Sequence, residues 1–143
     1  MNEDSVQLLQ ECYSGIEMAV ASIDQVMDYN METDLKALLE KTKTHHKELQ
    51  KKILERLARA GKKEKEPGMI ASAFSWLTAE MKLKMREDNH QIAKLMMDGC
   101  NMGIQSLSEY KNTYAGADSE AQQTAKALIE SEEEFMKDLK QYL

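Results

Sequence analysis

The feature that most constrains the fold of this chain is a repeat of apolar residues at every third or fourth position. The first stretch of the repeat contains Val6, Leu9, Tyr13, Ile16, Val20, Ile23 and Met27. An α-helix turns once in about 3.6 residues, so side chains with this spacing form one stripe along one face. Three further long stretches show the same repeat, and no segment alternates apolar and polar residues as a half-buried strand does. The sequence therefore predicts an all-α protein.

Breaks in the repeat divide the chain into four long helices. The first is expected to begin near Asp4 or Ser5, which can cap its exposed amide groups. The second stripe contains Leu35, Leu38, Thr42, His45, Leu49, Ile53 and Leu57. Gly61 is expected to end this helix, because glycine is common just after a helix C-terminus.

The two remaining long helices form a second pair. One is expected from about His90 to Tyr114, with a stripe of Met96, Cys100, Gly103, Leu107 and Tyr110. The other is expected to start with a capping box of Ser119 and Gln122. Its stripe contains Ala121, Ala125, Leu128, Glu132, Phe135, Leu139 and Tyr142. Short turns at 30–33 and 115–118 make each pair an antiparallel hairpin, so we expect a four-helix bundle.

The segment between the two hairpins has a different character. Residues 61–68 form a charged linker that closes with Pro67 and Gly68. After it, a stripe of Ile70, Phe74, Leu77, Met81 and Met85 predicts a shorter helix lying across the bundle. Trp76 is offset from this stripe, and is as consistent with an interface as with packing on the flank of the bundle. Asp88 or Asn89 is expected to cap the next helix.

Composition limits what the chain can do. A length of 143 residues is enough for one domain with a substantial core, so we expect a single domain over 1–143. The net charge is −6, and this diffuse acidic balance disfavours nucleic-acid binding, which needs a concentrated patch of basic residues. No apolar run approaches the roughly 20 residues of a membrane helix, and the acidic start MNEDSVQLL is unlike a signal peptide. Two cysteines suit a reducing compartment, so a cytoplasmic protein is expected.

Several ionisable residues fall on or beside the apolar stripes. Residues equally far from the turn of an antiparallel hairpin lie side by side, which pairs Glu17 with His45 and places Cys100 near Glu132. These four share one layer if both hairpins turn at the same end of the bundle. Within the run ESEEE at 130–134, the apolar flanks select Glu132 as the member that faces inward. A lone ionised carboxylate there would cost several kcal/mol unless it were paired, protonated or metal-bound.

The adjacent histidines admit two interpretations. In one, His45 and Glu48 form half of a metal site, with Glu17 opposite. In the other, His45 is a hydrogen-bonded core residue while His46 and Glu48 point outward. The second interpretation is favoured, because two adjacent residues cannot both face one seam.

Sulfur-bearing residues also have two interpretations. Cys100 could join His45 and a glutamate around zinc, since thiolate and imidazole are usual zinc ligands. A small buried thiol beside Gly103 explains it more simply. Met81 and Met85, with His90 nearby, could bind copper(I), but gap filling and self-association account for the 11 methionines better.

Taken together, these segments resemble the bacterial ferritin-like helical domains of unknown function, which are related to stress-associated ferritin-like proteins. The resemblance is carried by SGIEMAV, DLKALLEKTKTHHKELQKKI, ASAFSWLTAEMK, DGCNMGIQSLSEYKNTY and EEEFMKDLKQYL. It implies a ferritin-like antiparallel four-helix bundle with an additional short crossing helix. It also implies self-association, which we expect to give a homo-oligomer such as a dimer.

Metal-bearing relatives hold two irons with a Glu and a Glu-x-x-His motif from each helix pair. In this chain Glu17 matches the first Glu, but Thr42 occupies the Glu position of the motif that would end at His45. No histidine follows Glu132 at the required spacing. The residues that remain as candidate ligands for iron or zinc are Glu17, His45, Glu48 and Glu132.

Two functions fit this incomplete ligand set. The favoured one is a non-catalytic, oligomeric structural or interaction module with an incomplete di-iron site. The alternative is a metal-binding protein, for iron or zinc, with a redox or storage function. No nucleophile elbow, phosphate loop or paired zinc motif occurs in the sequence, so no catalytic residues are predicted.

Overall fold

Four long α-helices and one short terminal turn make up the secondary structure of the described residues. The structure is a computed structural model that describes residues 1–65 and 88–143. The helices are α1 (Glu3–Val26), α2 (Thr33–Arg59), α4 (Asn89–Thr113) and α5 (Ser119–Leu139), followed by the 3-10 turn η1 (Lys140–Tyr142). Within the described ranges there is no strand, so the prediction of an all-α four-helix bundle is confirmed. The crossing helix predicted from the stripe between Ile70 and Met85 lies outside the described residues.

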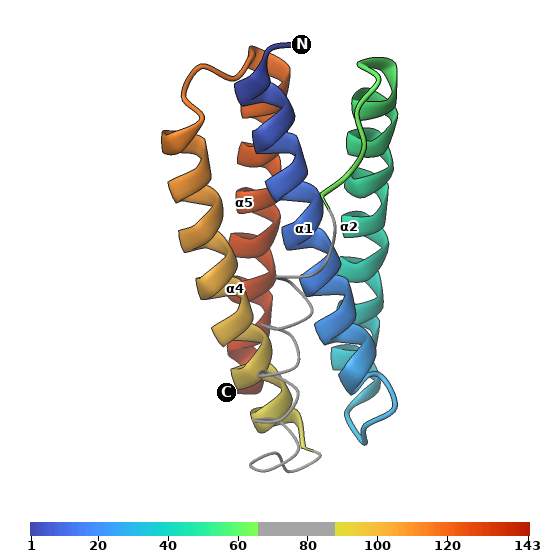
Figure 1. The fold of residues 1–143 in the computed structure, drawn as a ribbon. Helices are drawn as coiled ribbons and strands as arrows, with labels where there is room; N and C mark the ends of the chain where they lie inside the picture. The colour runs from blue at the N-terminus through green and yellow to red at the C-terminus, as the bar shows by residue number, and fades with distance from the viewer. Residues whose placement is uncertain (66–87) are drawn as a thin grey trace.

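Contacts at the two ends of the bundle fix the directions of the helices. At one end, Asn2 Nδ2 donates a hydrogen bond to the carbonyl oxygen of Gly116 at 2.7 Å, which joins the start of α1 to the turn between α4 and α5. At the other end, the backbone N–H of Glu32 donates to Asn89 Oδ1 at 2.8 Å, which joins the first turn to the start of α4. Helices α1 and α5 therefore run one way, and α2 and α4 run the other way (Figure 1). The two hairpins turn at opposite ends of the bundle.

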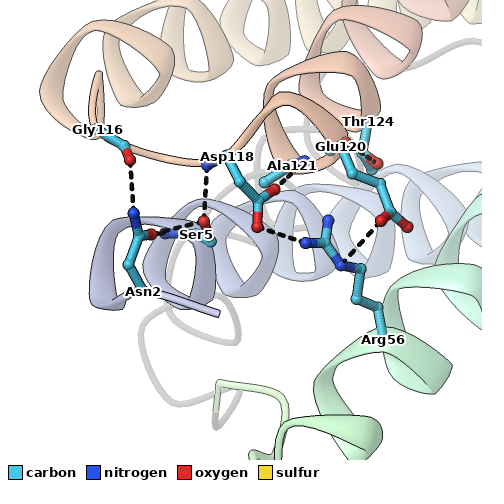
Figure 2. Close-up of polar contacts among 8 residues, drawn as sticks. All are labelled: Asn2, Ser5, Arg56, Gly116, Asp118, Glu120, Ala121 and Thr124. Atoms are coloured by element: carbon cyan, nitrogen blue, oxygen red, sulfur yellow. Dashed lines mark hydrogen bonds and ion pairs between the residues drawn. The ribbon is translucent and has the colours of Figure 1, made fainter.

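Figure 2 shows the polar network at the end where the chain begins. Ser5 Oγ donates to Asn2 Oδ1 at 2.6 Å and accepts from the backbone N–H of Asp118 at 2.8 Å. The guanidinium of Arg56 bridges Asp118, at 2.5 Å, and Glu120, at 3.3 Å. Side chains from α1, α2 and the start of α5 are thus tied together at this end.

Polar side chains cap three of the helices. Asn2 Oδ1 accepts from the backbone N–H of Ser5, so α1 begins slightly earlier than predicted. Asp88 caps α4 as predicted. Asp118, the residue before the predicted Ser119, caps α5. Gly61 follows α2 with a φ of 70°, which confirms it as the glycine that ends the helix.

The buried faces agree with the predicted stripes to different degrees. In α5, all six predicted positions from Ala121 to Leu139 are buried. In α1, a second buried row of Leu8, Cys12 and Val26 accompanies the predicted one. Helix α1 contacts all three other long helices, and a helix with neighbours on several sides buries more than one stripe.

The predicted stripe of α2 is wrong by one residue at two positions. The structure buries Leu39 and His46, whereas Leu38 and His45 were the residues predicted to lie in the core. The predicted face and the observed face both pass through Thr42 in steps of three and four residues. At the two positions where they differ, each of them has one leucine and one histidine. The pattern around these residues therefore does not distinguish the two faces, which differ by about 100° of rotation.

Candidate functional site

The middle of the bundle holds a buried pair of ionisable side chains, His46 of α2 and Glu132 of α5. His46 is fully buried and Glu132 is 7% exposed. The imidazole Nε2 lies 2.5 Å from Glu132 Oε1, and Nδ1 lies 2.9 Å from the backbone oxygen of Thr42. The inward orientation predicted for Glu132 is confirmed, and its partner is the histidine that was expected to face solvent.

The hydrogen-bond partners of this pair fix how many protons it holds. A backbone carbonyl only accepts, so His46 Nδ1 carries a proton that it donates to Thr42. The contact between Nε2 and Oε1 requires one further proton, held by the imidazole or by the carboxyl group. The first arrangement is an imidazolium–carboxylate ion pair and the second is a neutral pair. In both, the net charge is zero, which is how a carboxyl group can be buried at an acceptable free-energy cost.

Helix α4 approaches Glu132 through a cysteine and a glycine. Cys100 is buried, and its pKa is raised above the ordinary thiol range by burial and then by the charge of Glu132 and a hydrogen bond to it. A Cβ placed on Gly103 would lie 3.9 Å from Glu132 Oε2, so the backbone of α4 comes close to the carboxyl group. A thiol held in its protonated form is neither a good nucleophile nor a good metal ligand.

The other predicted site residues lie elsewhere. His45 and Glu48 are exposed on α2, so the prediction that His45 faces the core is wrong. Glu17 accepts a hydrogen bond from Gln50 Nε2. The structure therefore does not bring Glu17, His45 and Glu48 together with Glu132. In residues 1–65 and 88–143, no group of three or more His, Cys, Asp or Glu side chains is arranged to hold a metal ion.

The polar layer forms even though the two hairpins turn at opposite ends. His46, Cys100 and Glu132 each lie within three residues of the middle of their helices. Reversing the direction of a helix about its middle would leave His46 in place and would move Cys100 by about 3 Å and Glu132 by about 9 Å along the axis. Of the predicted layer of Glu17, His45, Cys100 and Glu132, only Cys100 and Glu132 come together, and His46 takes the place expected for His45. The condition attached to that layer, that both hairpins turn at the same end, is not met.

A cavity of about 380 Å³ adjoins the pair. Its walls come mainly from α1 and α4. Thr42 and His46 of α2, Lys65 beyond α2, and Leu128, Glu132 and Phe135 of α5 also line it. Most of the lining atoms are apolar. The His46–Glu132 pair is thus one polar feature of a largely hydrophobic space.

A second buried carboxylate, Glu11 of α1, lines the same cavity. Lys65 Nζ forms an ion pair with it, and this hydrogen bond raises the pKa of Lys65. Burial and the charge of Glu11 raise the pKa of Tyr110. Sequence reasoning missed Glu11, because it lies off the predicted stripe of its helix and its cationic partner is 54 positions away.

Comparison of the chain with protein-family models, with curated proteins and with solved structures finds no match. The resemblance to ferritin-like domains therefore stays a prediction from the sequence. No described helix is long and apolar enough to cross a membrane.

Proposed function

We propose that this protein is a non-catalytic, ferritin-like helical bundle that serves as a structural or interaction module. In this proposal the His46–Glu132 pair stands where metal-bearing bundles of this kind hold their ions. The central polar layer then contributes to one defined packing of the helices. We also propose that the protein self-associates as a dimer, as the resemblance implies. Its two free cysteines favour a cytoplasmic location.

The observation that carries the proposal is the 2.5 Å distance between His46 Nε2 and Glu132 Oε1. Two ligands of one metal ion, each about 2.0 to 2.2 Å from it, lie about 3 Å or more apart. The two side chains are therefore placed to hydrogen bond to each other. The high pKa of the Cys100 thiol supports the same conclusion, since a thiol must lose its proton to bind a metal.

One observation favours the alternative, a metal-binding protein for iron or zinc. His46 donates from Nδ1 to a backbone carbonyl, which is the arrangement that orients Nε2 in many metal-binding histidines. An ion would then replace the proton between Nε2 and Oε1, and the two side chains would have to move apart. This alternative makes His46, and not His45, the ligand.

Elemental analysis and thermal denaturation separate the two functions. Protein purified without a chelator is expected to contain less than about a tenth of an equivalent of iron, zinc or manganese, and its melting temperature should not rise when these metals are added. A stoichiometric metal content, together with a rise in melting temperature that His46→Gln abolishes, would contradict the structural role. His45→Gln is the matched control, because His45 is the exposed neighbour on the same helix. Light scattering after size-exclusion chromatography tests the dimer.

A further inference from the structure

We propose that the cavity between α1 and α4 binds one uncharged, elongated aliphatic molecule that carries a single hydrogen-bonding head group. A medium-chain alcohol represents this class. The inference goes beyond the structural role proposed above and does not depend on it. It rests on the shape of the cavity, on the pairing of the charges around it, and on one buried hydroxyl group.

The shape of the cavity suits a linear molecule. Its lining on α1 runs from Glu11 to Ile23, and its lining on α4 runs from Leu95 to Tyr110. At about 1.5 Å per residue, these stretches are about 18 Å and about 22 Å long. A space of about 380 Å³ that extends this far along the helix axes is narrow. It fits an extended chain better than a broad ring system.

Small residues keep this space open. Gly15, Ala19, Gly99 and Gly103 lie along the two walls. In the described part of the chain, no atom outside the helix's own backbone and the adjoining residues lies within 4 Å of a Cβ built on Gly99. The larger lining side chains are mostly aliphatic, aromatic or thioether groups, which bind apolar chains through contact area alone.

The charged groups around the cavity already have partners. Glu11 is paired with Lys65, and Glu132 is paired with His46. A ligand with a net charge would lose its hydration on entering and would find no free charge of opposite sign among these four side chains. The cavity therefore favours an uncharged ligand over an otherwise identical ion.

Ser14 supplies the hydrogen-bonding group. It is 6% exposed and lines the cavity, and its Oγ has no hydrogen-bond partner among the described residues. A serine in a helix commonly donates to the carbonyl one turn earlier, as the half-buried Ser22 does to Met18 at 2.9 Å. Ser14 does not form this bond. Within residues 1–65 and 88–143 its hydroxyl therefore has no partner, and the head group of a bound molecule would satisfy this otherwise costly buried polar atom.

The first test uses the full chain and dodecanol. Binding is measured by displacement of the uncharged fluorescent probe N-phenylnaphthylamine and by the rise in melting temperature. We expect saturable binding of one dodecanol, with decanol weaker by about fifteenfold for the two methylenes removed. Dodecanoate and dodecylamine should bind at least about tenfold more weakly than dodecanol, because each carries a charge at neutral pH. No binding of dodecanol up to its solubility limit would overturn the proposal, and equal binding of the charged compounds would overturn the preference for an uncharged ligand.

Two variants locate the binding. Gly99→Leu places a large side chain in the cavity and is expected to weaken dodecanol binding more than about tenfold without lowering the melting temperature, because leucine is also the better helix former. Asn101→Leu is the matched control, since Asn101 is exposed on the same helix and does not line the cavity. Ser14→Ala should weaken dodecanol binding by about two- to tenfold while leaving stability unchanged or raised. Unaltered binding to the Gly99 variant, or equal loss in the Asn101 control, would show that dodecanol binds elsewhere.

Discussion

Replacement of His46 by leucine tests whether the buried pair behaves as one unit. The imidazole is fully buried and is the hydrogen-bond partner that Glu132 has on α2. Its loss leaves a buried carboxyl group facing an apolar side chain, and removing one member of a buried pair typically costs about 3 to 5 kcal/mol. For a chain of this length, that corresponds to a fall in melting temperature of roughly 10 to 15 °C.

The complementary change, Glu132→Leu, removes the partner of His46 Nε2 and leaves one nitrogen of the buried imidazole unsatisfied. The expected cost is about 1 to 3 kcal/mol, the usual penalty for a buried polar atom without a partner. The double variant replaces both polar groups by apolar ones of similar size, and such replacements are often neutral or stabilising. Its free energy of unfolding should lie within about 1 kcal/mol of the wild-type value, and the coupling between the two sites should be at least about 3 kcal/mol.

Urea denaturation followed by circular dichroism at pH 7 measures all four free energies of unfolding. His45→Leu is the matched control, because the side chain of His45 is exposed and its loss should change stability by less than about 0.5 kcal/mol. Equal costs for the His45 and His46 replacements would refute the assignment of His46 to the core. Additive costs in the double variant would refute the pairing with Glu132.

The cysteines, the cap of α5 and two glycines can be tested separately. The thiols of Cys12 and Cys100 are buried, and burial raises the pKa of both. The pKa of Cys12 is raised to about 12, with the charge of Glu11 as the second cause. Both thiols should therefore react with a disulfide reagent far more slowly in the native protein than in urea. Because the folded-state pKa of each thiol lies above the unfolded value of 9.0, the unfolded chain loses these protons first, and the free energy of unfolding should fall as the pH rises above about 9. The hydrogen bond from the backbone N–H of Ala121 and the contact with Arg56 lower the pKa of Asp118. The stability that Asp118 contributes should therefore be full above the unfolded pKa of 3.8 and lost as the pH falls through the lower folded pKa. Asp118→Ala should cost about 1 kcal/mol of unfolding free energy at pH 7 and less at pH 3. Gly61→Ala should cost about 1 kcal/mol because Gly61 has a positive φ, whereas Gly99→Ala in mid-helix should stabilise by up to about 1 kcal/mol, both measured by urea denaturation.

The helix pattern predicted most of the fold, and α2 shows where such a pattern fails. A strict alternation that passes through Leu38 and His45 would continue beyond Leu49 to Lys52 and Arg56, which are charged. The buried face instead ends in Ile53 and Leu57. Counting back from these two residues in steps of four and three leads to His46, so the apolar end of the helix carried the information that its middle lacked.

The site was less predictable than the fold. The inward orientation of Glu132 could be predicted because only one apolar face can be drawn along α5, and Glu132 lies on that face between apolar residues. The partners of Glu11 and Glu132 could not be anticipated in this way, since each depends on what another helix or a distant loop places opposite. Periodicity reports which face of a helix is buried, but it carries no information about which residue of a neighbouring helix lies across from it.

The His46–Glu132 pair also fixes the register of α2 against α5, which apolar contacts alone do not fix. Leucine and isoleucine side chains tolerate sliding of one helix along another, because one apolar contact replaces the next at little cost. A slide of α2 by one turn would move His46 by about 5.4 Å relative to Glu132, so that both groups would be buried without partners. A rotation of about 100° that brought His45 inward would also remove His46 from the core and expose Ile53 and Leu57. The polar pair and the apolar end of α2 therefore select the same register. Register errors in α2 should become detectable only when both members of the pair are replaced, as heterogeneous helix packing in a variant whose overall stability is unchanged.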